Sequence, residues 1–248
     1  MPVTTKLNLS NALSYGFDRI TTRGGAILLV VYVLFQLAMQ VSVQSLFSQV
    51  LADAFPDEEF SHLYPLAVDL PAAVSAGVTA LLVLVGAVLG VVTIRALYAG
   101  LNDVPTADHT RRLARTAGVM VVVSVVTFVA ILIGTALLFF PGVFLAVSLV
   151  FATVVVIIED AGVIESLERS WELTSGNRFR LLVLGVIIGV GGGLVGFAFG
   201  IVGVFAPVVG ELATTVTSGV LSLFGAAVLV GAYRQLAGDR EPRSTSEW

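Results

Sequence analysis

The 248-residue sequence contains no cysteine, one lysine and two histidines. The absence of cysteine excludes disulfides, thiolate nucleophiles and cysteine-ligated metals. The single lysine, Lys6, is not near a glycine-rich turn, which excludes a phosphate-binding loop that ends in Gly-Lys. Arginine therefore carries nearly all of the positive charge.

Charged residues are scarce as well, at 12% of the chain against about 25% in soluble domains. Hydrophobic residues make up 57%, and the mean hydropathy is +0.99. This composition excludes an ordinary soluble domain and indicates a protein of the lipid bilayer. The formal net charge of −4 provides no basic surface for a nucleic acid, so we expect none as a partner.

Six mainly apolar runs are long enough to cross a membrane, because a spanning helix needs about 20 residues for a hydrocarbon core of about 30 Å. The runs cover residues 26–47, 71–95, 115–138, 142–158, 181–205 and 212–233. Between the third and fourth runs, the turn Phe139-Phe140-Pro141-Gly142 predicts that proline ends one helix and begins the next. The runs do not alternate at every second residue, as barrel strands do. We therefore predict an all-α polytopic membrane bundle of six transmembrane helices, in one domain over residues 1–248.

All 13 basic residues fall on one side of this arrangement. They are Lys6, Arg19, Arg23, Arg95, Arg111, Arg112, Arg115, Arg169, Arg178, Arg180, Arg234, Arg240 and Arg243. In the connections on the other side all charged residues are acidic. They lie between Asp53 and Asp69 and at Glu211. Because cytoplasmic loops retain positive charge, we predict a multi-pass protein of the cell membrane with both termini in the cytoplasm. His62 and His109 then lie on opposite sides, and we expect no metal and no other cofactor.

Two segments outside the spans predict amphipathic helices on the inner membrane surface. They are the N-terminal arm, residues 1–25, and a surface helix in residues 160–176. The apolar positions that recur at helical spacing are Leu9, Leu13, Phe17 and Ile20 in the arm and Ile164, Leu167 and Trp171 in the second segment. A polar tail of residues 238–248 completes the domain.

The surface helix carries its own start and stop signals. We expect Asp160 to cap its first turn and Gly176 to end it. Glu165 and Arg169 are four residues apart, which predicts an ion pair along the helix.

Charged residues also flank this helix, with Glu159 and Asp160 before it and Arg178 and Arg180 after it. The grouping is open to two interpretations. It could form a headgroup or partner site at the inner surface. Alternatively, Asp160 caps the helix and the arginines anchor the fifth span at the water boundary.

The order of residues in this region resembles a known family. From Pro141 the sequence reads Pro-Gly, an apolar span, Glu159-Asp160, and then Ser166-Leu167-Glu168-Arg169-Ser170-Trp171-Glu172-Leu173-Thr174-Ser175-Gly176-Asn177. This order resembles the membrane domain of glycerophosphoryl diester phosphodiesterases and related uncharacterised six-helix membrane proteins, although Ser166 stands where that group usually has alanine. The resemblance implies the six-helix fold. No phosphodiesterase domain follows Tyr233 in this sequence, so we carry over no catalytic residue and expect no enzymatic activity.

The fifth span is rich in glycine, at Gly185, Gly189, Gly191, Gly192, Gly193, Gly196 and Gly200. Several of these are four residues apart, a spacing that lets helix backbones approach closely in lipid. Three successive glycines also weaken a helix, by about 1 kcal/mol each relative to alanine. The pattern therefore favours either close helix packing or a hinge. No strand precedes it, which argues against a dinucleotide-binding turn.

One face of the first span is polar, with Tyr32, Gln36, Gln40 and Gln44 one helical turn apart. A glutamine side chain is unfavourable against lipid, so this face should point to another helix or to water. Interhelical hydrogen bonding and the lining of a polar pathway are the two explanations. The ionisable residues Arg95, Glu159 and Glu211 are predicted at span ends, which weighs against a proton-coupled pathway.

From these patterns we predict an integral membrane protein without catalytic activity that acts as a scaffold or accessory protein. The alternative is a small permease or channel that uses the glutamine face and the glycine-rich helix. A lipid-modifying enzyme is a third hypothesis, which lacks a visible nucleophile–base pair or metal cluster. We expect membrane lipids as partners, and the sequence leaves open other membrane proteins and a second copy of the chain.

Overall fold

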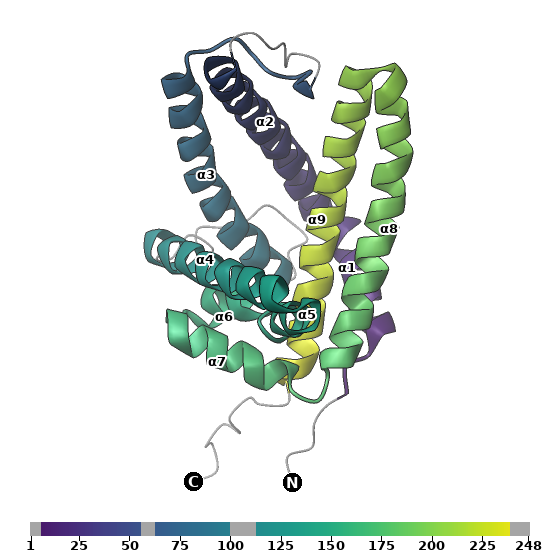
Figure 1. Ribbon diagram of the computed structural model, residues 1–248. Helices are drawn as coiled ribbons and strands as arrows, with labels where there is room; N and C mark the ends of the chain where they lie inside the picture. Colours follow the sequence, from purple (N-terminus) through teal and green to yellow (C-terminus); the bar gives the residue numbers. More distant parts are fainter. Residues whose placement is uncertain (1–5, 56–62, 100–112, 239–248) are drawn as a thin grey trace, which may run out of the picture. The chain divides into compact units, whose positions relative to one another are not determined.

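The computed structural model describes residues 6–55, 63–99 and 113–238, and within these ranges the regular structure is helical, without strands. The helices are α1 Leu9–Ile20, α2 Arg23–Ala54, α3 Ala72–Ala99, α4 Leu113–Leu137, α5 Phe139–Ser148, α6 Ala152–Glu159, α7 Val163–Thr174, α8 Arg178–Phe205 and α9 Pro207–Ala237 (Figure 1). The all-α prediction is confirmed. His62, His109 and the tail from residue 239 onward lie outside the described residues.

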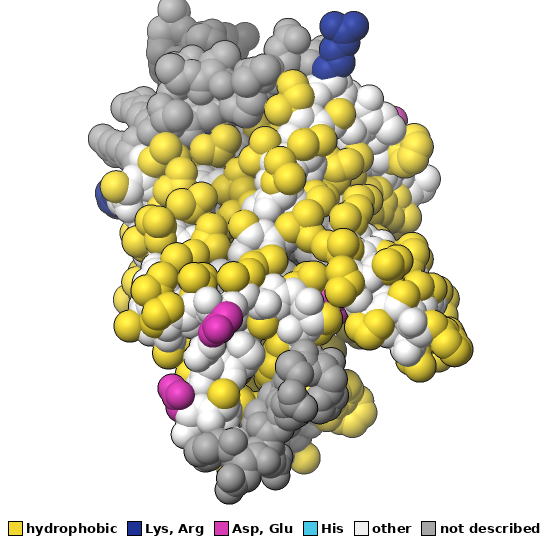
Figure 2. Space-filling model, turned by 90° about the horizontal axis from the view of Figure 1, so that it is seen from above, with side chains coloured by type: hydrophobic (Ala, Val, Ile, Leu, Met, Phe, Trp, Pro, Cys, Tyr) yellow, Lys and Arg dark blue, Asp and Glu magenta, His cyan; other side chains and the backbone are white. Residues whose placement is uncertain are grey.

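Six stretches of these helices are long and apolar enough to cross a membrane: α2, α3, α4, the pair α5 and α6, α8, and α9. They coincide with the six runs predicted from the sequence. α2 and α9 extend several residues beyond the predicted runs, because helical hydrogen bonding continues into flanks whose polar side chains can reach water. Many large hydrophobic side chains of these helices are exposed, as expected for helices that face lipid. Hydrophobic side chains are also widespread on the described part of the face seen in Figure 2.

The chain divides into two compact units. Unit 1 contains residues 1–25, 90–187 and 224–248, and unit 2 contains residues 26–89 and 188–223. Unit 1 therefore holds α1 and α4 to α7 complete, together with one end of each of the long helices α3, α8 and α9. Unit 2 holds most of α2 and the remaining parts of α3, α8 and α9.

A single residue connects α4 to α5, and the two helices lie side by side in unit 1 (Figure 1). Leu138 has an extended backbone, with φ −158° and ψ 137°, and α5 begins directly after it. Pro141 lies in the first turn of α5, where a missing N–H is tolerated. The prediction that this proline begins the second helix is confirmed, whereas the prediction that it ends the first is wrong, because α4 already ends at Leu137. A Cβ built on Gly134 would lie 3.1 Å from Cα of Gly142, so the two backbones meet here.

The fourth predicted span is broken between α5 and α6, and α7 completes the hydrogen bonding at the break. Ser170 and Thr174 donate their hydroxyls to the carbonyl of Ser148 at 2.9 and 3.3 Å. Ser170 Oγ also accepts the N–H of Phe151 at 3.2 Å. These bonds replace main-chain bonds that an unbroken helix would form. All four residues are buried, so the break is a built part of the fold.

α6 is enclosed by protein in unit 1. Its buried residues are Ala152, Val154, Val155, Val156 and Ile157. Val156 packs in one cluster with Val123 of α4 and with Leu167 of α7. A helix that is apolar on all sides is suited to such a buried position. The last residue of α6, Glu159, thereby comes to lie among the neighbouring helices of unit 1.

α7 begins at Val163, after Gly162 and not after Asp160, so the prediction that Asp160 caps it is wrong. Gly162 is the N-cap, and the carboxylate of Glu165 accepts its N–H at 3.2 Å. Asp160 instead ends α6 in the left-handed region with φ 57°, which aspartate tolerates better than most side chains. Gly176, with φ 81°, follows the end of α7 as predicted.

Candidate functional site

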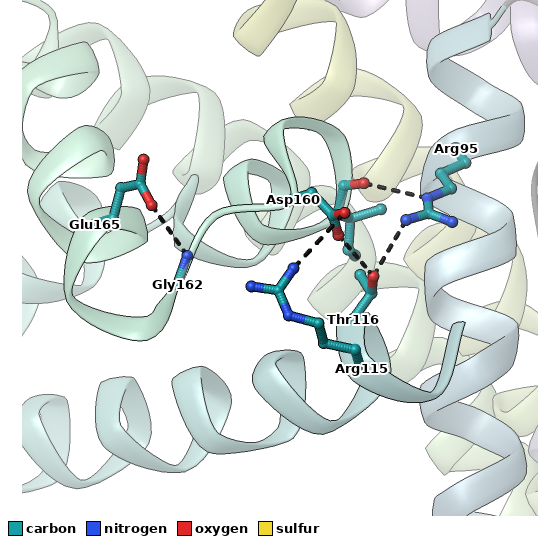
Figure 3. A network of polar contacts seen from close by, with 7 residues as sticks. Arg95, Arg115, Thr116, Asp160, Gly162 and Glu165 are labelled. Carbon is teal, nitrogen blue, oxygen red and sulfur yellow. Dashed lines mark hydrogen bonds and ion pairs between the residues drawn. The ribbon is translucent and has the colours of Figure 1, made fainter. Parts of the chain in front are cut away.

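A network of polar contacts in unit 1 links α3, α4 and the end of α6 (Figure 3). Arg95 donates from Nε to the carbonyl of Ile157 and from Nη2 to the hydroxyl of Thr116, both at 3.2 Å. That hydroxyl donates to Oδ1 of Asp160 at 3.0 Å. Arg115 lies 3.8 Å from Oδ2 of the same carboxylate. The buried Thr116 hydroxyl thus connects a cationic and an anionic side chain, and the carboxylate of Asp160 remains 35% exposed.

Glu159, the last residue of α6, joins α6 to α7 and α9. Tyr233 in α9 donates its hydroxyl to Oε1 of Glu159 at 2.6 Å, and Nε of Arg169 donates to the same oxygen at 3.3 Å. Arg169 also lies 3.6 Å from Glu172. The predicted pair of Arg169 with Glu165 is therefore wrong, because Glu165 turns back to cap α7.

The structure does not bring the four charged residues that flank the surface helix into one site. Glu159 and Asp160 bond to different helices, as described above. Arg180 donates from Nη1 to the carbonyl of Leu7 at 2.8 Å. Cζ of Arg178 lies 4.6 Å from the ring centre of Phe144 and 4.4 Å from that of Trp171.

The N-terminal arm is held by side chains from much later in the chain. Asn177 Oδ1 accepts the N–H of Leu7 at 2.9 Å, so that, together with the bond from Arg180, both main-chain groups of this buried residue are paired. Gln235 pairs the main chain of Asn8, accepting its N–H at 2.9 Å and donating to its carbonyl at 3.3 Å. We call these five residues the arm clamp: Leu7, Asn8, Asn177, Arg180 and Gln235.

α1 continues from the arm clamp and packs against α9 within unit 1. Tyr15 donates its hydroxyl to the carbonyl of Leu97 at 2.6 Å and accepts a bond from Arg234 at 3.2 Å. A Cβ on Gly231 would lie 2.8 Å from the Tyr15 ring, so glycine makes room for this contact. Phe17, on the predicted apolar face of α1, remains 65% exposed and available to lipid.

In unit 2, part of the predicted glutamine face meets a carboxylate. Gln40 and Gln44 both donate to Oε1 of Glu211 in α9, Gln44 at 2.9 Å. The side-chain oxygen of Gln44 accepts the N–H of Leu66 at 2.9 Å. Glu211 lies one turn after the start of α9, near the end of this span as predicted. Interhelical hydrogen bonding therefore accounts for these two glutamines, whereas the other members of the face, Tyr32 and Gln36, are partly exposed.

The glycine-rich part of α8 makes one close contact among the described residues. A Cβ on Gly192 would lie 3.0 Å from Cδ1 of Leu221 in α9. A Cβ would meet no atom within 4 Å at Gly185, Gly189, Gly191, Gly193, Gly196 and Gly200. α8 and α9 also approach closely at Gly203 and Gly210, outside the predicted set. Close packing is thus observed at Gly192, and the hinge stays a prediction.

Most side chains that hold these sites were not identified from the sequence. They are Thr116, Ser170, Thr174, Asn177, Tyr233 and Gln235. Such residues carry no charge signal, and their partners lie in other helices. Ser170 and Thr174 had a signal in hindsight, since they share one face of the surface helix at i,i+4 spacing. Within the described ranges, no group of three or more potential ligands could hold a metal ion.

The fold and these contacts are those of an all-helical, multi-pass membrane protein in which polar side chains join surface helices to the ends of spans. The chain belongs to the family described as Domain of unknown function (DUF7847), whose family model matches residues 75–236. No curated protein and no solved structure matches the chain. The family description names no activity, so the resemblance to the glycerophosphoryl diester phosphodiesterase membrane domain stays a prediction.

Proposed function

We propose that the protein is a multi-pass protein of the cell membrane, with both termini in the cytoplasm, that acts as a scaffold or accessory protein. Its contact surface would be the polar faces of α1 and α7. The arm clamp carries this proposal, because it ties the start of α1 to α8 and α9 through bonds to four main-chain groups.

The attachment of α7 supports the same conclusion. Ser170 and Thr174 bond to α5, and Arg169 bonds to Glu159, so one side of α7 is fixed to the bundle. The other side is exposed and acidic, at Glu165, Glu168 and Glu172. A surface that is already ordered loses little entropy on binding, which suits it to recognise a partner protein.

Site-specific photocross-linking in native membranes tests the scaffold role. A photoreactive residue at Glu168 in α7 or Ser14 in α1, both exposed, should yield reproducible adducts with protein. The same residue at Leu194, an exposed apolar position in α8, should yield lipid adducts and serves as the control. The added change Asn177→Ala should reduce the adducts at Ser14 and spare those at Glu168. Lipid adducts alone at both surface positions would contradict the proposal.

The proposed topology has its own test, which is simple because the chain has no native cysteine. Leu63→Cys and Glu168→Cys place single thiols at exposed positions in the first connection and in α7. In intact cells an impermeant thiol reagent should label the first variant, and only permeabilised cells should show labelling of the second. Labelling of both in intact cells would contradict the six-span arrangement.

A small permease or channel is the second candidate function, and Glu211 is the observation that favours it. An ionisable side chain within an apolar helix often belongs to an ion or proton pathway, and here two glutamines face it. Cation flux into proteoliposomes that is lost with Glu211→Gln, but kept with Asp69→Asn at an exposed site, would favour this function. Flux no greater than in protein-free liposomes would favour the scaffold.

A further inference from the structure

Arg178, the first residue of α8, has an unusual environment for a charged side chain. Its guanidinium lies over Phe144 of α5 and Trp171 of α7, 4.6 and 4.4 Å from the ring centres. Among the described residues it forms no hydrogen bond or ion pair, and its Nε is buried without a partner. The protein therefore supplies stacking contacts to the guanidinium, and the N–H donors of its two terminal nitrogens are left for another molecule.

The two rings hold the guanidinium in place. Phe144 and Trp171 contact each other edge-on, with ring centres 5.4 Å apart and an interplanar angle of 77°. Both rings remain partly exposed, and the next residue, Phe179, is 76% exposed. Exposed aromatic rings beside an arginine at the end of a span are typical of the boundary between lipid and water.

We propose that Arg178, held by Phe144 and Trp171, binds the phosphate of an anionic phospholipid headgroup. A guanidinium presents paired N–H donors that match phosphate oxygens, and stacking orients the group before binding. Its position at the N-terminus of α8 adds the positive end of the helix dipole. The site concerns lipid and does not depend on the scaffold role.

Neighbouring carboxylates restrict where the phosphate can lie. Trp171 also lines a groove of about 420 Å³ with Leu149, Leu167, Glu168 and Glu172. The two glutamates would repel a phosphate inside this groove, so the favourable position is against Arg178. The apolar part of the groove can accept carbon atoms of the same lipid, which a free phosphate ion lacks.

Native mass spectrometry of the full-length protein, titrated in detergent with phosphatidylglycerol or phosphatidylcholine, tests the proposal. Phosphatidylglycerol should bind more tightly than phosphatidylcholine. Arg178→Gln should weaken phosphatidylglycerol binding about tenfold, since it removes charge-assisted hydrogen bonds. Arg178→Lys keeps the charge but loses the planar fork and should be intermediate. The charge-matched control Arg23→Gln, at an exposed position outside the polar network, should change binding less than about twofold.

Two results would overturn the site. Equal binding of phosphatidylglycerol by the protein and by Arg178→Gln would exclude Arg178 as the ligand-binding group. Competition by inorganic phosphate at the concentration of the lipid would show that the site takes the free ion. If Arg178→Gln does not fold, two other measurements test the proposal. They are the preference of the unmodified protein for phosphatidylglycerol over phosphatidylcholine and the effect of Arg178→Lys on phosphatidylglycerol binding. Equal binding of the two lipids by the unmodified protein would refute the proposal.

Discussion

The N–H of Leu7 donates to Oδ1 of Asn177 at 2.9 Å, and the carbonyl of Leu7 accepts from Nη1 of Arg180 at 2.8 Å. A residue that precedes the first helix is thus paired by residues 170 and 173 positions later. Leu7 is buried, so these bonds are protected from competition by water. The residue before α1 is therefore held by the turn between α7 and α8 and by the first turn of α8.

Removing the acceptor at this contact should loosen the arm. Asn177→Ala leaves the buried N–H of Leu7 without a partner, which costs about 1–3 kcal/mol of the free energy of unfolding. Hydrogen exchange of residues 7–20 should become faster, while exchange in α4 stays the same. Asn11→Ala, at an exposed position in α1, is the control and should change neither. Unchanged exchange in the arm would show that Asn177 does not hold it.

Two threonine-to-valine changes on α4 should differ in their effect on the free energy of unfolding. Thr116→Val removes the buried hydroxyl between Arg95 and Asp160 and should cost about 1 kcal/mol, because two partly exposed charged groups lose a hydrogen-bond partner. The Thr127 hydroxyl is buried without a partner, so Thr127→Val should be neutral or stabilising. Thermal unfolding in detergent gives both values. Equal losses of stability in the two variants would mean that the bonds of Thr116 to Arg95 and Asp160 add nothing, and that both losses reflect the lower helix propensity of valine.

The break in the fourth span should depend on Ser170. Ser170→Ala removes both a donor to the Ser148 carbonyl and an acceptor for the Phe151 N–H, so we expect a loss of about 2 kcal/mol. Ser166, equally buried, bonds only within its own helix, and Ser166→Ala should cost less. Hydrogen exchange at the Phe151 amide, measured in both variants, separates a local effect from a global one. Faster exchange in both variants would argue against the specific role of Ser170.

Neighbouring glycines in α8 provide a further matched pair. Gly193→Ala should stabilise the protein by up to about 1 kcal/mol, because alanine favours the helix and its Cβ meets no atom within 4 Å. Gly192→Leu should destabilise it, because the side chain would collide with Leu221. Both effects are measured as shifts in thermal stability. Destabilisation by Gly193→Ala would indicate that α8 contacts a molecule outside this chain.

Helix boundaries show where local sequence signals were sufficient and where they failed. Gly176 was predicted to end the surface helix, and it does, because glycine readily adopts the positive φ required there. Pro141 was expected to end one helix and begin the next; it lies in the first turn of α5, but α4 already ends at Leu137. Asp160 was expected to cap α7, yet its carboxylate bonds to Thr116 of α4. A cap predicted from neighbouring residues is overridden when a more distant partner is available.

The sequence by itself determined the all-helical class and the position of the six apolar helices. A bilayer leaves no water for main-chain groups, so an apolar run of sufficient length must satisfy its own hydrogen bonds as a helix. The tertiary structure alone decided which polar side chains meet. Arg95 bonds to Thr116, Tyr233 to Glu159 and Asn177 to Leu7 only because separate helices pack side by side. Such contacts depend on the packing of distant segments, which the periodicity of any one segment does not encode.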